Sequence, residues 1–221
     1  MIRVVQPART AWTVRAIVTA GCLVIVPWMG SHAQAISPAA MAKADSGRPP
    51  YTAADVRFMQ GMIGHHAQAV WMAGLAPTHG AASSLRTLAE RIDISQRDEI
   101  GFMQRWLRER HETAPDPLAH HEMAGHDMAG MPMSGPMMPG MLTHEQMMQL
   151  DEARGTEFDR LFLTFMIQHH QGALTMVDQL FSSTGAGQDV AIFRFASDVT
   201  ADQTTEIERM RSMLSAIPPR S

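Results

Sequence analysis

Cysteine is almost absent from this chain of 221 residues, and the single one, Cys22, lies close to the N-terminus. The remainder of the chain therefore contains neither disulfide bonds nor thiolate metal ligands. The one markedly apolar run, Ala16 to Met29, has only about fourteen residues, which is too few to cross a bilayer comfortably. No segment shows the alternation of apolar and polar residues that is typical of a strand. These absences argue against a disulfide scaffold, a membrane anchor and a β fold.

The N-terminal segment has the layout of a secretory signal. Three arginines supply positive charge, the apolar run 16–29 follows all three, and Ala33-Gln34-Ala35 matches an A-x-A cleavage site. We therefore predict that residues 1–35 are a signal peptide, cleaved after Ala35, and that the protein is periplasmic or secreted. A lipoprotein with a lipidated Cys22 is the alternative, although the apolar stretch continues beyond that cysteine.

Basic residues are scarce once this segment is removed. Residues 1–35 contain three arginines and no acid, so 15 of the 18 basic residues remain beside 22 acidic ones, a net charge of −7. An excess of acid argues against nucleic acid as a partner and offers no basic face for anionic lipid. We expect metal ions as partners, with no membrane contact after cleavage, and the sequence identifies no delivery protein.

What the chain does contain is a repeat. The sequence FMQGMIGHH, which begins at Phe58, recurs as FLTFMIQHH from Phe162. The counterparts lie 104 residues apart, and they are Met62/Met166, His65/His169, His66/His170, Ala69/Ala173 and Met72/Met176. A pair of histidines in one apolar segment is commonplace, whereas the same pair in the same frame twice indicates a duplicated structural unit.

Apolar residues at helical spacing surround both copies of the motif. Two long helices are predicted in the first half of the domain, one from Thr52 to about Ala76 and one from Ser83 or Ser84 to about Arg110. A short helix is predicted after Thr143, followed by long helices from Thr156 to Ser182 and through Ile192–Met213. Thr52 with Asp55, and Thr156 with Asp159, have the spacing of a capping box. The fold class is therefore all-α, a four-helix bundle made of two repeated helical hairpins. A linker covers residues 36–50 and the bundle domain 51–217, with hairpins at 51–112 and 143–217 and a flexible His/Met-rich loop at 113–142.

The second and fourth helices also match each other, at an offset of 107 residues, including Gln96/Gln203 and Glu99/Glu206. Folding would place these four residues and the four repeated histidines in one layer of an apolar bundle. The two His-His motifs should converge there, since each lies near the middle of its helix. Unpaired polar groups in such a layer would cost several kcal/mol each, so either mutual hydrogen bonds or a metal must satisfy them.

The mixture of ligand types favours metal. Met62 precedes His65 by three residues and His66 by four, so one helical face carries thioether and imidazole together. This combination without thiolate suits copper, above all Cu(I). Glu99 and Glu206 would then accept hydrogen bonds from the imidazole N–H groups. The unrepeated His79, His111 and His144 are expected to be solvated, and Asp55 and Asp159 are explained by the capping boxes.

The loop carries a separate signal, because nine of the 20 methionines fall between Met123 and Met148. Tracts of His and Met among Gly and Pro are typical of metal-scavenging segments. The candidate ligands in this loop are His120, His121, Met123, His126, Met128, Met131 and Met133.

The doubled pattern Asp-x-x-Phe-x-x-x-Met-Ile-x-His-His-x-x-Ala-x-x-Met, followed by Gln-x-x-Glu-Ile-x-x-Met, resembles a bacterial family. This family is known as domain of unknown function three-hundred-and-five and includes periplasmic copper-binding proteins of the CopM type. The resemblance covers about residues 51–214 and implies a ferritin-like four-helix bundle that binds copper in copper tolerance. Carried over residue by residue, the implied ligands are Met62, His65, His66 and Met72, with Met166, His169, His170 and Met176 in the second copy.

Three functions remain open at this point. The first is a copper- or silver-sequestering or carrier protein without enzymatic turnover, whose cofactor or cargo is a copper ion. The second is a ferritin-like di-iron or di-manganese oxidase, which needs about four Glu and two His with Glu-x-x-His on two helices. Neither His-His helix has a Glu three residues before a His. The third is a structural bundle whose buried polar layer binds no metal.

Overall fold

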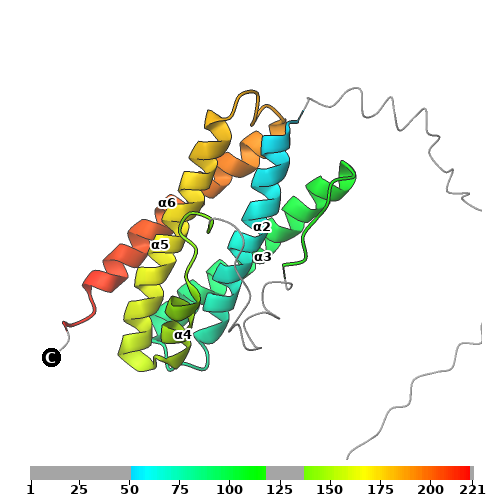
Figure 1. The fold of residues 1–221 in the computed structure, drawn as a ribbon. Coiled ribbons are helices and arrows are strands. Elements are labelled where there is room, and N and C mark those ends of the chain that lie inside the picture. The colour runs from blue at the N-terminus through cyan, green and yellow to red at the C-terminus, as the bar shows by residue number, and fades with distance from the viewer. Residues whose placement is uncertain (1–50, 118–136, 220–221) are drawn as a thin grey trace, which may run out of the picture. The chain divides into compact units, whose positions relative to one another are not determined.

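The structure, a computed structural model, describes residues 51–117 and 137–219. This part of the chain contains five helices and no strand (Figure 1). They are α2 (Ala53–Leu75), α3 (Ser83–Glu109), α4 (His144–Glu152), α5 (Gly155–Ser182) and α6 (Val190–Ser215). The predicted all-α bundle of two helical hairpins is confirmed. The predicted signal peptide, the linker, and the loop ligands from His120 to Met133 lie outside the described residues.

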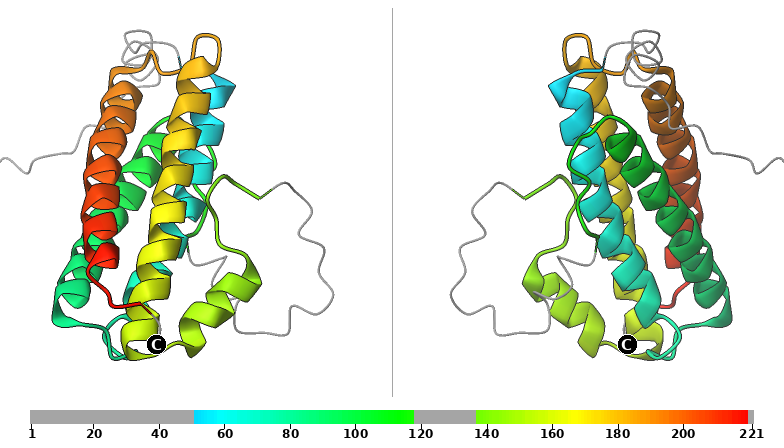
Figure 2. Two further views of the ribbon diagram at one scale, coloured as in Figure 1. Left: turned by 90° about the vertical axis from the view of Figure 1, so that its left-hand side faces the viewer. Right: turned by 90° about the vertical axis from the view of Figure 1, so that its right-hand side faces the viewer.

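The two hairpins, α2 with α3 and α5 with α6, meet along α2 and α5 (Figure 2). These two helices run antiparallel, because the start of each contacts the turn that follows the other. Asp55, at the start of α2, accepts a hydrogen bond from the Gly187 N–H after α5, at 2.7 Å. Asp159, at the start of α5, accepts from the Ala82 N–H after α2, at 3.2 and 3.3 Å. The short helix α4 packs on α5 and α2.

The apolar core consists of two clusters of buried side chains, one toward each end of the bundle. One cluster contains Phe58 and Met62 from α2 together with Met176 and Leu180 from α5. The other contains Met72 from the end of α2 and, from the first half of α5, side chains that include Met166. In α3 and α6, too, the apolar residues on one side of a polar segment belong to one cluster and those on the other side to the other. The polar segments are Gln96–Glu99 in α3 and Gln203–Glu206 in α6. A polar layer therefore crosses the middle of the bundle.

Two of the predicted side-chain caps, those of α3 and α5, are wrong. The boxes at Thr52 and Thr143 are confirmed, but α5 begins at Gly155 with Arg154 as its N-cap, and no side chain caps it. Gly155 has a φ of +57° and donates its N–H to the His79 carbonyl, at 2.8 Å. This bond starts the helix before Thr156, and the Asp159 carboxylate is left to bind the opposite turn. Helix α3 likewise begins after Ala82 without a side-chain cap, although Ser83 and Ser84 stand beside it.

His79 also departs from the expectation that it is solvated. It is buried, with Nε2 2.8 Å from the Asp151 carbonyl and Nδ1 2.9 Å from the Thr78 hydroxyl. Both ring nitrogens thus have partners, and the side chain joins the turn after α2 to the end of α4.

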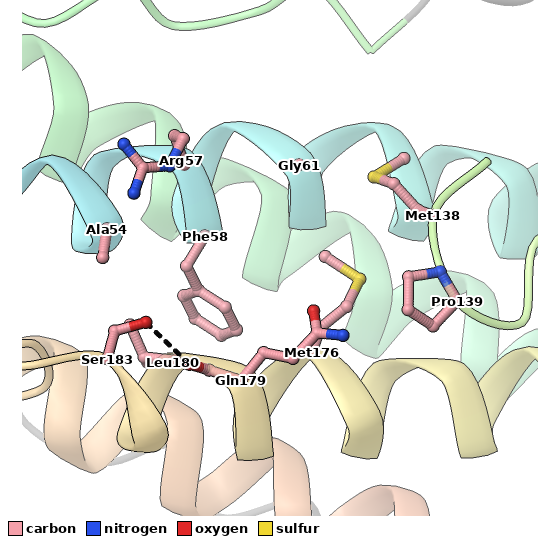
Figure 3. Close-up of a pocket in the computed structure, with 10 residues that line it drawn as sticks. All are labelled: Ala54, Arg57, Phe58, Gly61, Met138, Pro139, Met176, Gln179, Leu180 and Ser183. Carbon is pink, nitrogen blue, oxygen red and sulfur yellow. Dashed lines mark hydrogen bonds between the residues drawn. The ribbon is translucent and has the colours of Figure 1, made fainter. Parts of the chain in front are cut away.

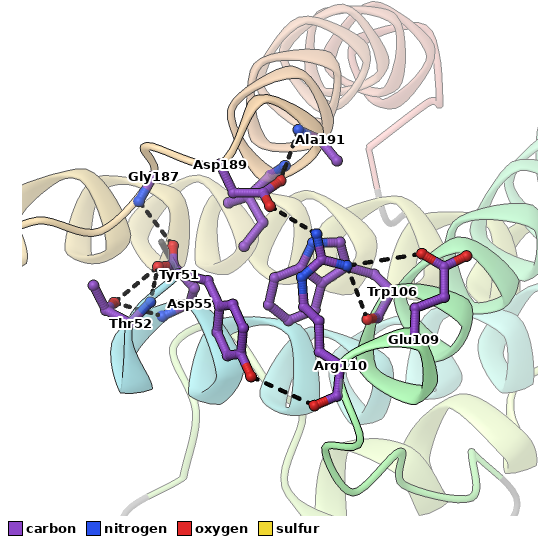
Figure 4. Close-up of polar contacts among 10 residues, drawn as sticks. Tyr51, Thr52, Asp55, Trp106, Glu109, Arg110, Gly187, Asp189 and Ala191 are labelled. Carbon is purple, nitrogen blue, oxygen red and sulfur yellow. Dashed lines mark hydrogen bonds and ion pairs between the residues drawn. The ribbon is translucent and has the colours of Figure 1, made fainter. Parts of the chain in front are cut away.

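A buried ion pair closes the other end of the bundle (Figure 4). Arg110, which follows α3, binds the Asp189 carboxylate at 2.7 Å, and the same carboxylate caps α6 through the N–H groups of Ala191 and Ile192. The guanidinium lies over the Trp106 ring, 4.2 Å from its centroid. Arg110 holds the pKa of Asp189 below its usual range against the opposing effect of burial, so the carboxylate stays ionised.

The ends of the predicted flexible loop are attached to the bundle, contrary to the expectation for residues 113–142. On the N-terminal side, Gln60 donates to the Thr113 carbonyl at 2.8 Å. On the C-terminal side, residues Met138–Leu142 form a segment, here called the strap, that crosses α2 and α5. Gln68 holds it with two bonds, one to the Leu142 carbonyl at 3.1 Å and one from the Leu142 N–H at 2.8 Å.

The strap lies against α5 because residue 172 has no side chain. A Cβ atom at Gly172 would lie 2.5 Å from the Gly140 Cα and closer still to the Pro139 carbonyl oxygen. Gly140 has a φ of +74°, a conformation that favours glycine, and it contacts the same turn of α5. Each partner thus depends on the small size of the other.

No helix in the described ranges is both long and apolar enough to span a membrane.

We predict that Gly172→Ala lowers the free energy of unfolding by about 1–3 kcal/mol, since the added methyl group forces the strap away from α5. Gly74→Ala is the matched control: this glycine is also helical, but nothing lies within 4 Å of the position its Cβ would take. That control should gain about 0.5–1 kcal/mol from helix propensity alone. Urea denaturation measures both, and equal stabilisation by the two substitutions would show that the strap does not pack on Gly172.

Candidate metal centre

The repeated histidines lie in the polar layer between the two apolar clusters. All four side chains are fully buried on α2 and α5. The rings of His65 and His169 lie against each other with their centroids 3.8 Å apart, so the predicted convergence of the motifs is confirmed for this pair. His66 and His170 diverge from them, toward α3 and α6. Antiparallel packing brings the two middles together because each motif lies at the centre of its helix.

Each imidazole places its Nε2 against an oxygen atom. His66 contacts Glu99 at 2.5 Å and His170 contacts Glu206 at 2.7 Å, so the two hairpins make the same bond. The central pair differs, since His169 bonds the backbone carbonyl of His65 at 2.9 Å. His65 instead bonds the carbonyl of Pro139, in the strap, at 3.0 Å.

These partners fix the tautomer of each ring. A carbonyl or carboxylate oxygen accepts hydrogen bonds, so Nε2 carries a proton, and in a neutral ring Nδ1 then holds the lone pair. The Nδ1 atoms of all four histidines are buried and have no hydrogen-bond partner within the described residues. A buried acceptor without a partner is costly. An imidazole that donates one N–H to an oxygen and offers its other nitrogen is the usual arrangement of a metal-ligating histidine.

The central pair is also uncharged at neutral pH. Burial has the largest effect on the pKa of His65, the neighbouring His66 and His170 act in the same direction, and the bond to Pro139 opposes them; together they lower this pKa to about 3. Burial, followed by the charges of the other three histidines, holds the pKa of His169 well below its usual range. Only a neutral imidazole has a lone pair for a metal ion, so the environment keeps both rings in the ligand form.

Carboxylates and amides complete the layer from α3 and α6. The Glu99 and Glu206 side chains are each partly exposed, and both raise the pKa of Asp202, after the larger effect of burial. The two glutamates therefore share one side of the bundle, each bound to an imidazole. Gln96 and Gln203 are buried, and the Gln96 Oε1 and both amide atoms of Gln203 have no partner in the part of the chain described.

The repeated methionines supply sulfur on both sides of this layer. Met62 and Met176 belong to one apolar cluster, and Met72 and Met166 to the other. Among residues 51–117 and 137–219, no group of three or more His, Cys, Asp or Glu side chains is placed to hold a metal ion. A metal ion in the layer would therefore draw on these thioethers together with the imidazole Nδ1 atoms. Nitrogen and sulfur donors of this kind suit a soft metal.

Sequence reasoning missed the contribution of the strap. The bond from His65 goes to a backbone carbonyl, and no side-chain pattern signals such a partner. The sequence feature that could have indicated the strap is a difference between the two repeats. Glycine and glutamine change places, since Gln68 corresponds to Gly172 and Gly64 to Gln168. Three of these residues contact the strap, and the two glutamines do so by hydrogen bonds.

Comparison with known proteins gives matches to one family. The family described as domain of unknown function (DUF305) matches residues 55–214. A DUF305 fragment from Deinococcus radiodurans is 27% identical with a TM-score of 0.59, and covers 76% of this chain and 99% of its own. CopM in its Cu(II)-bound form is 27% identical with a TM-score of 0.56, over 73% of this chain and 95% of its own. CopM in its Cu(I)-bound form is 25% identical with a TM-score of 0.55, over the same shares. No curated protein matches.

We predict that the metal-free protein loses stability as the pH falls below 6.5. In the unfolded chain His65 takes up a proton near its ordinary pKa of 6.5, whereas in the fold its pKa is about 3. Protons therefore bind the unfolded state preferentially between these values, and the stability present above pH 6.5 is lost on acidification. His65 alone accounts for on the order of 2 kcal/mol between pH 6.5 and pH 5.

Urea midpoints at pH 7.5 and pH 5, with chelator present, measure this loss. The variant His65→Gln/His169→Gln should lose clearly less stability than the native protein, and His144→Gln, at an exposed position, should lose as much as the native protein. A double variant with an unchanged pH dependence would contradict the assignment.

Proposed function

The chain belongs to the DUF305 family, and on this basis we propose that it is a copper-binding protein of the periplasm or the extracellular space. It sequesters or carries copper, without turnover, through the imidazole and thioether groups of the bundle. The observation that carries the proposal is the set of four buried imidazoles, each with Nε2 held by an oxygen and a lone pair on Nδ1 without a partner.

Ligand chemistry supports copper over harder metals. Cu(I) prefers thioether and imidazole ligands, and the layer has two methionines on either side of it. A harder metal would prefer glutamate oxygens, and one oxygen of each glutamate is already bonded to His66 or His170. Structures of CopM with Cu(I), Cu(II) and silver show that the fold accommodates these ions in a relative. Silver fits the same donors.

The location follows from the N-terminal sequence, whose signal features lie at residues 1–35. In an oxidising compartment thiolates are lost to disulfides, whereas thioethers persist as ligands. The His/Met loop, including His120, His121 and His126, would raise the number of copper ions held per chain. Glu99 and Glu206 would orient the imidazoles and increase their basicity rather than bind the metal.

The first test is stabilisation by copper. The bundle site exists only in the folded state, so bound Cu(I) should raise the melting temperature by mass action. At free Cu(I) one-hundred-fold above Kd the gain is about 2.7 kcal/mol, roughly 5–10 °C for a domain of this size. Sites in the His/Met loop would bind copper equally in the folded and the unfolded chain, so they would not contribute to this shift. A melting temperature unmoved by excess Cu(I) and Cu(II) would end the proposal.

The control replaces residues 118–136 with a Gly/Ser linker of equal length, which leaves the strap in place. The replacement should lower the number of copper ions bound while keeping the thermal shift. Metal analysis of the aerobically purified protein separates the remaining alternative, because iron or manganese at about two ions per chain would favour a di-metal oxidase.

The second test asks whether the two motifs serve one site. In the linker variant, His65→Ala and His169→Ala should each weaken copper binding, and the double variant should lose less than the sum. A coupling of about 0.5–3 kcal/mol is expected for residues that share a site. His144→Ala, which removes an exposed imidazole, is the matched control and should show no coupling with either. Strict additivity of His65 and His169 would mean that copper occupies two separate sites.

A further inference from the structure

The layer poses a problem of access, since all four imidazoles are fully buried. A pocket of about 260 Å³ lies between α2 and α5, beside the strap (Figure 3). Its wall includes Phe58 and Gly61 from α2, Met138 and Pro139 from the strap, and Met176 from α5. Pro139 links it directly to the layer, because its carbonyl accepts the bond from His65.

Two thioethers meet in this pocket. A Cβ atom built on Gly61 would lie 3.3 Å from the Met138 sulfur and 3.4 Å from the Met176 terminal methyl group. The ends of both side chains thus lie over one point on α2, and Figure 3 shows Met176 pointing from α5 toward α2 and Met138 beside α2. Two convergent thioethers are suitable ligands for a soft monovalent cation.

The second repeat shows that the space is specific to this side of the bundle. The counterpart of Gly61 is Phe165, which is buried and packs in the other apolar cluster. The counterpart of Met176 is Met72, which is fully buried in that cluster. The Phe165 side chain therefore fills, in the second repeat, the space that Gly61 leaves open in the first. The strap adds Met138 on the open side only.

We propose that Met138 and Met176 form a loading site for a soft monovalent cation, Cu(I) or Ag(I), from which the ion passes to the histidine layer. The passage to the layer rests on the proposed function, whereas binding at the two thioethers does not. Arg57 lies on the same wall. The guanidinium of Arg57 repels cations, so the affinity of this site for a cation has to come from thioether donation. The strap connects the two sites, since Met138 precedes the residue that bonds His65.

The test follows the methionine methyl groups of the intact protein by ¹³C NMR as Ag(I), which has no redox chemistry here, is added. The two resonances are assigned by Met138→Leu and Met176→Leu, substitutions that preserve volume and remove only the thioether. We expect both methyl resonances to shift at sub-stoichiometric Ag(I). The signal of Met103, a fully buried residue of α3 that does not line the pocket, should not shift with them.

Transfer kinetics test the second half of the proposal. The variant Met138→Leu, which leaves the thioethers on either side of the histidine layer in place, should take up Cu(I) from a chromogenic chelate about tenfold more slowly, with the thermal shift at saturation unchanged. Met103→Leu should retain the native rate. Gly61→Ala keeps both thioethers but crowds the point where they meet, so it should also slow uptake.

The outcomes separate this proposal from the proposed function. Unshifted Met138 and Met176 methyl groups, with copper still raising the melting temperature, would overturn the loading site alone. Shifted methyl groups with a native rate of uptake in Met138→Leu would overturn the passage of the ion to the layer. Absence of any thermal shift with copper would overturn the proposed function, whatever the methyl groups show.

Discussion

The structure depends on one constraint, which is that four imidazoles buried in an apolar bundle must each place an N–H group against an oxygen. The cost of an unpaired buried donor is comparable to a large part of the stability of a domain. The four oxygens come from Glu99, Glu206, the His65 carbonyl and the Pro139 carbonyl. Satisfying the donors fixes the tautomer of every ring and leaves every Nδ1 with its lone pair inside the bundle. The geometry of the candidate metal centre thus follows from the need of each buried imidazole N–H group for a hydrogen-bond acceptor.

Duplication solves half of this problem and the strap solves the rest. The His66–Glu99 and His170–Glu206 pairs are repeats of one another, as are the cross-contacts of Asp55 and Asp159. The central pair cannot be treated in the same way. His169 donates a hydrogen bond to the His65 carbonyl, whereas His65 donates to the Pro139 carbonyl in the strap, which belongs to neither repeat. Divergence between the hairpins therefore concentrates where that segment docks.

The sequence predicts those parts of the structure that periodic side chains determine. Repeated Met and His at helical spacing predict the bundle, the polar layer and the meeting of His65 with His169, because antiparallel packing brings helix centres together regardless of detail. What it could not predict depends on backbone groups and on missing side chains. The start of α5 is set by the φ of Gly155 and a carbonyl at His79. The position of the strap is set by the absence of a Cβ at Gly172. Neither leaves a periodic signal, so the sequence predicts a loop throughout residues 113–142.

The preference for a soft metal that we propose follows from how the oxygens of the layer are used. In a carboxylate-rich bundle the glutamates are free to bind hard divalent ions. Here the glutamates of the layer are hydrogen-bonded to His66 and His170, and the central rings are bonded to carbonyls. A hard ion that took the bonded Oε2 atoms or the two carbonyls as ligands would compete with hydrogen bonds that satisfy buried donors. A soft ion needs only the Nδ1 and sulfur atoms, which have no competing partner, so it can bind while the hydrogen bonds of the fold remain intact.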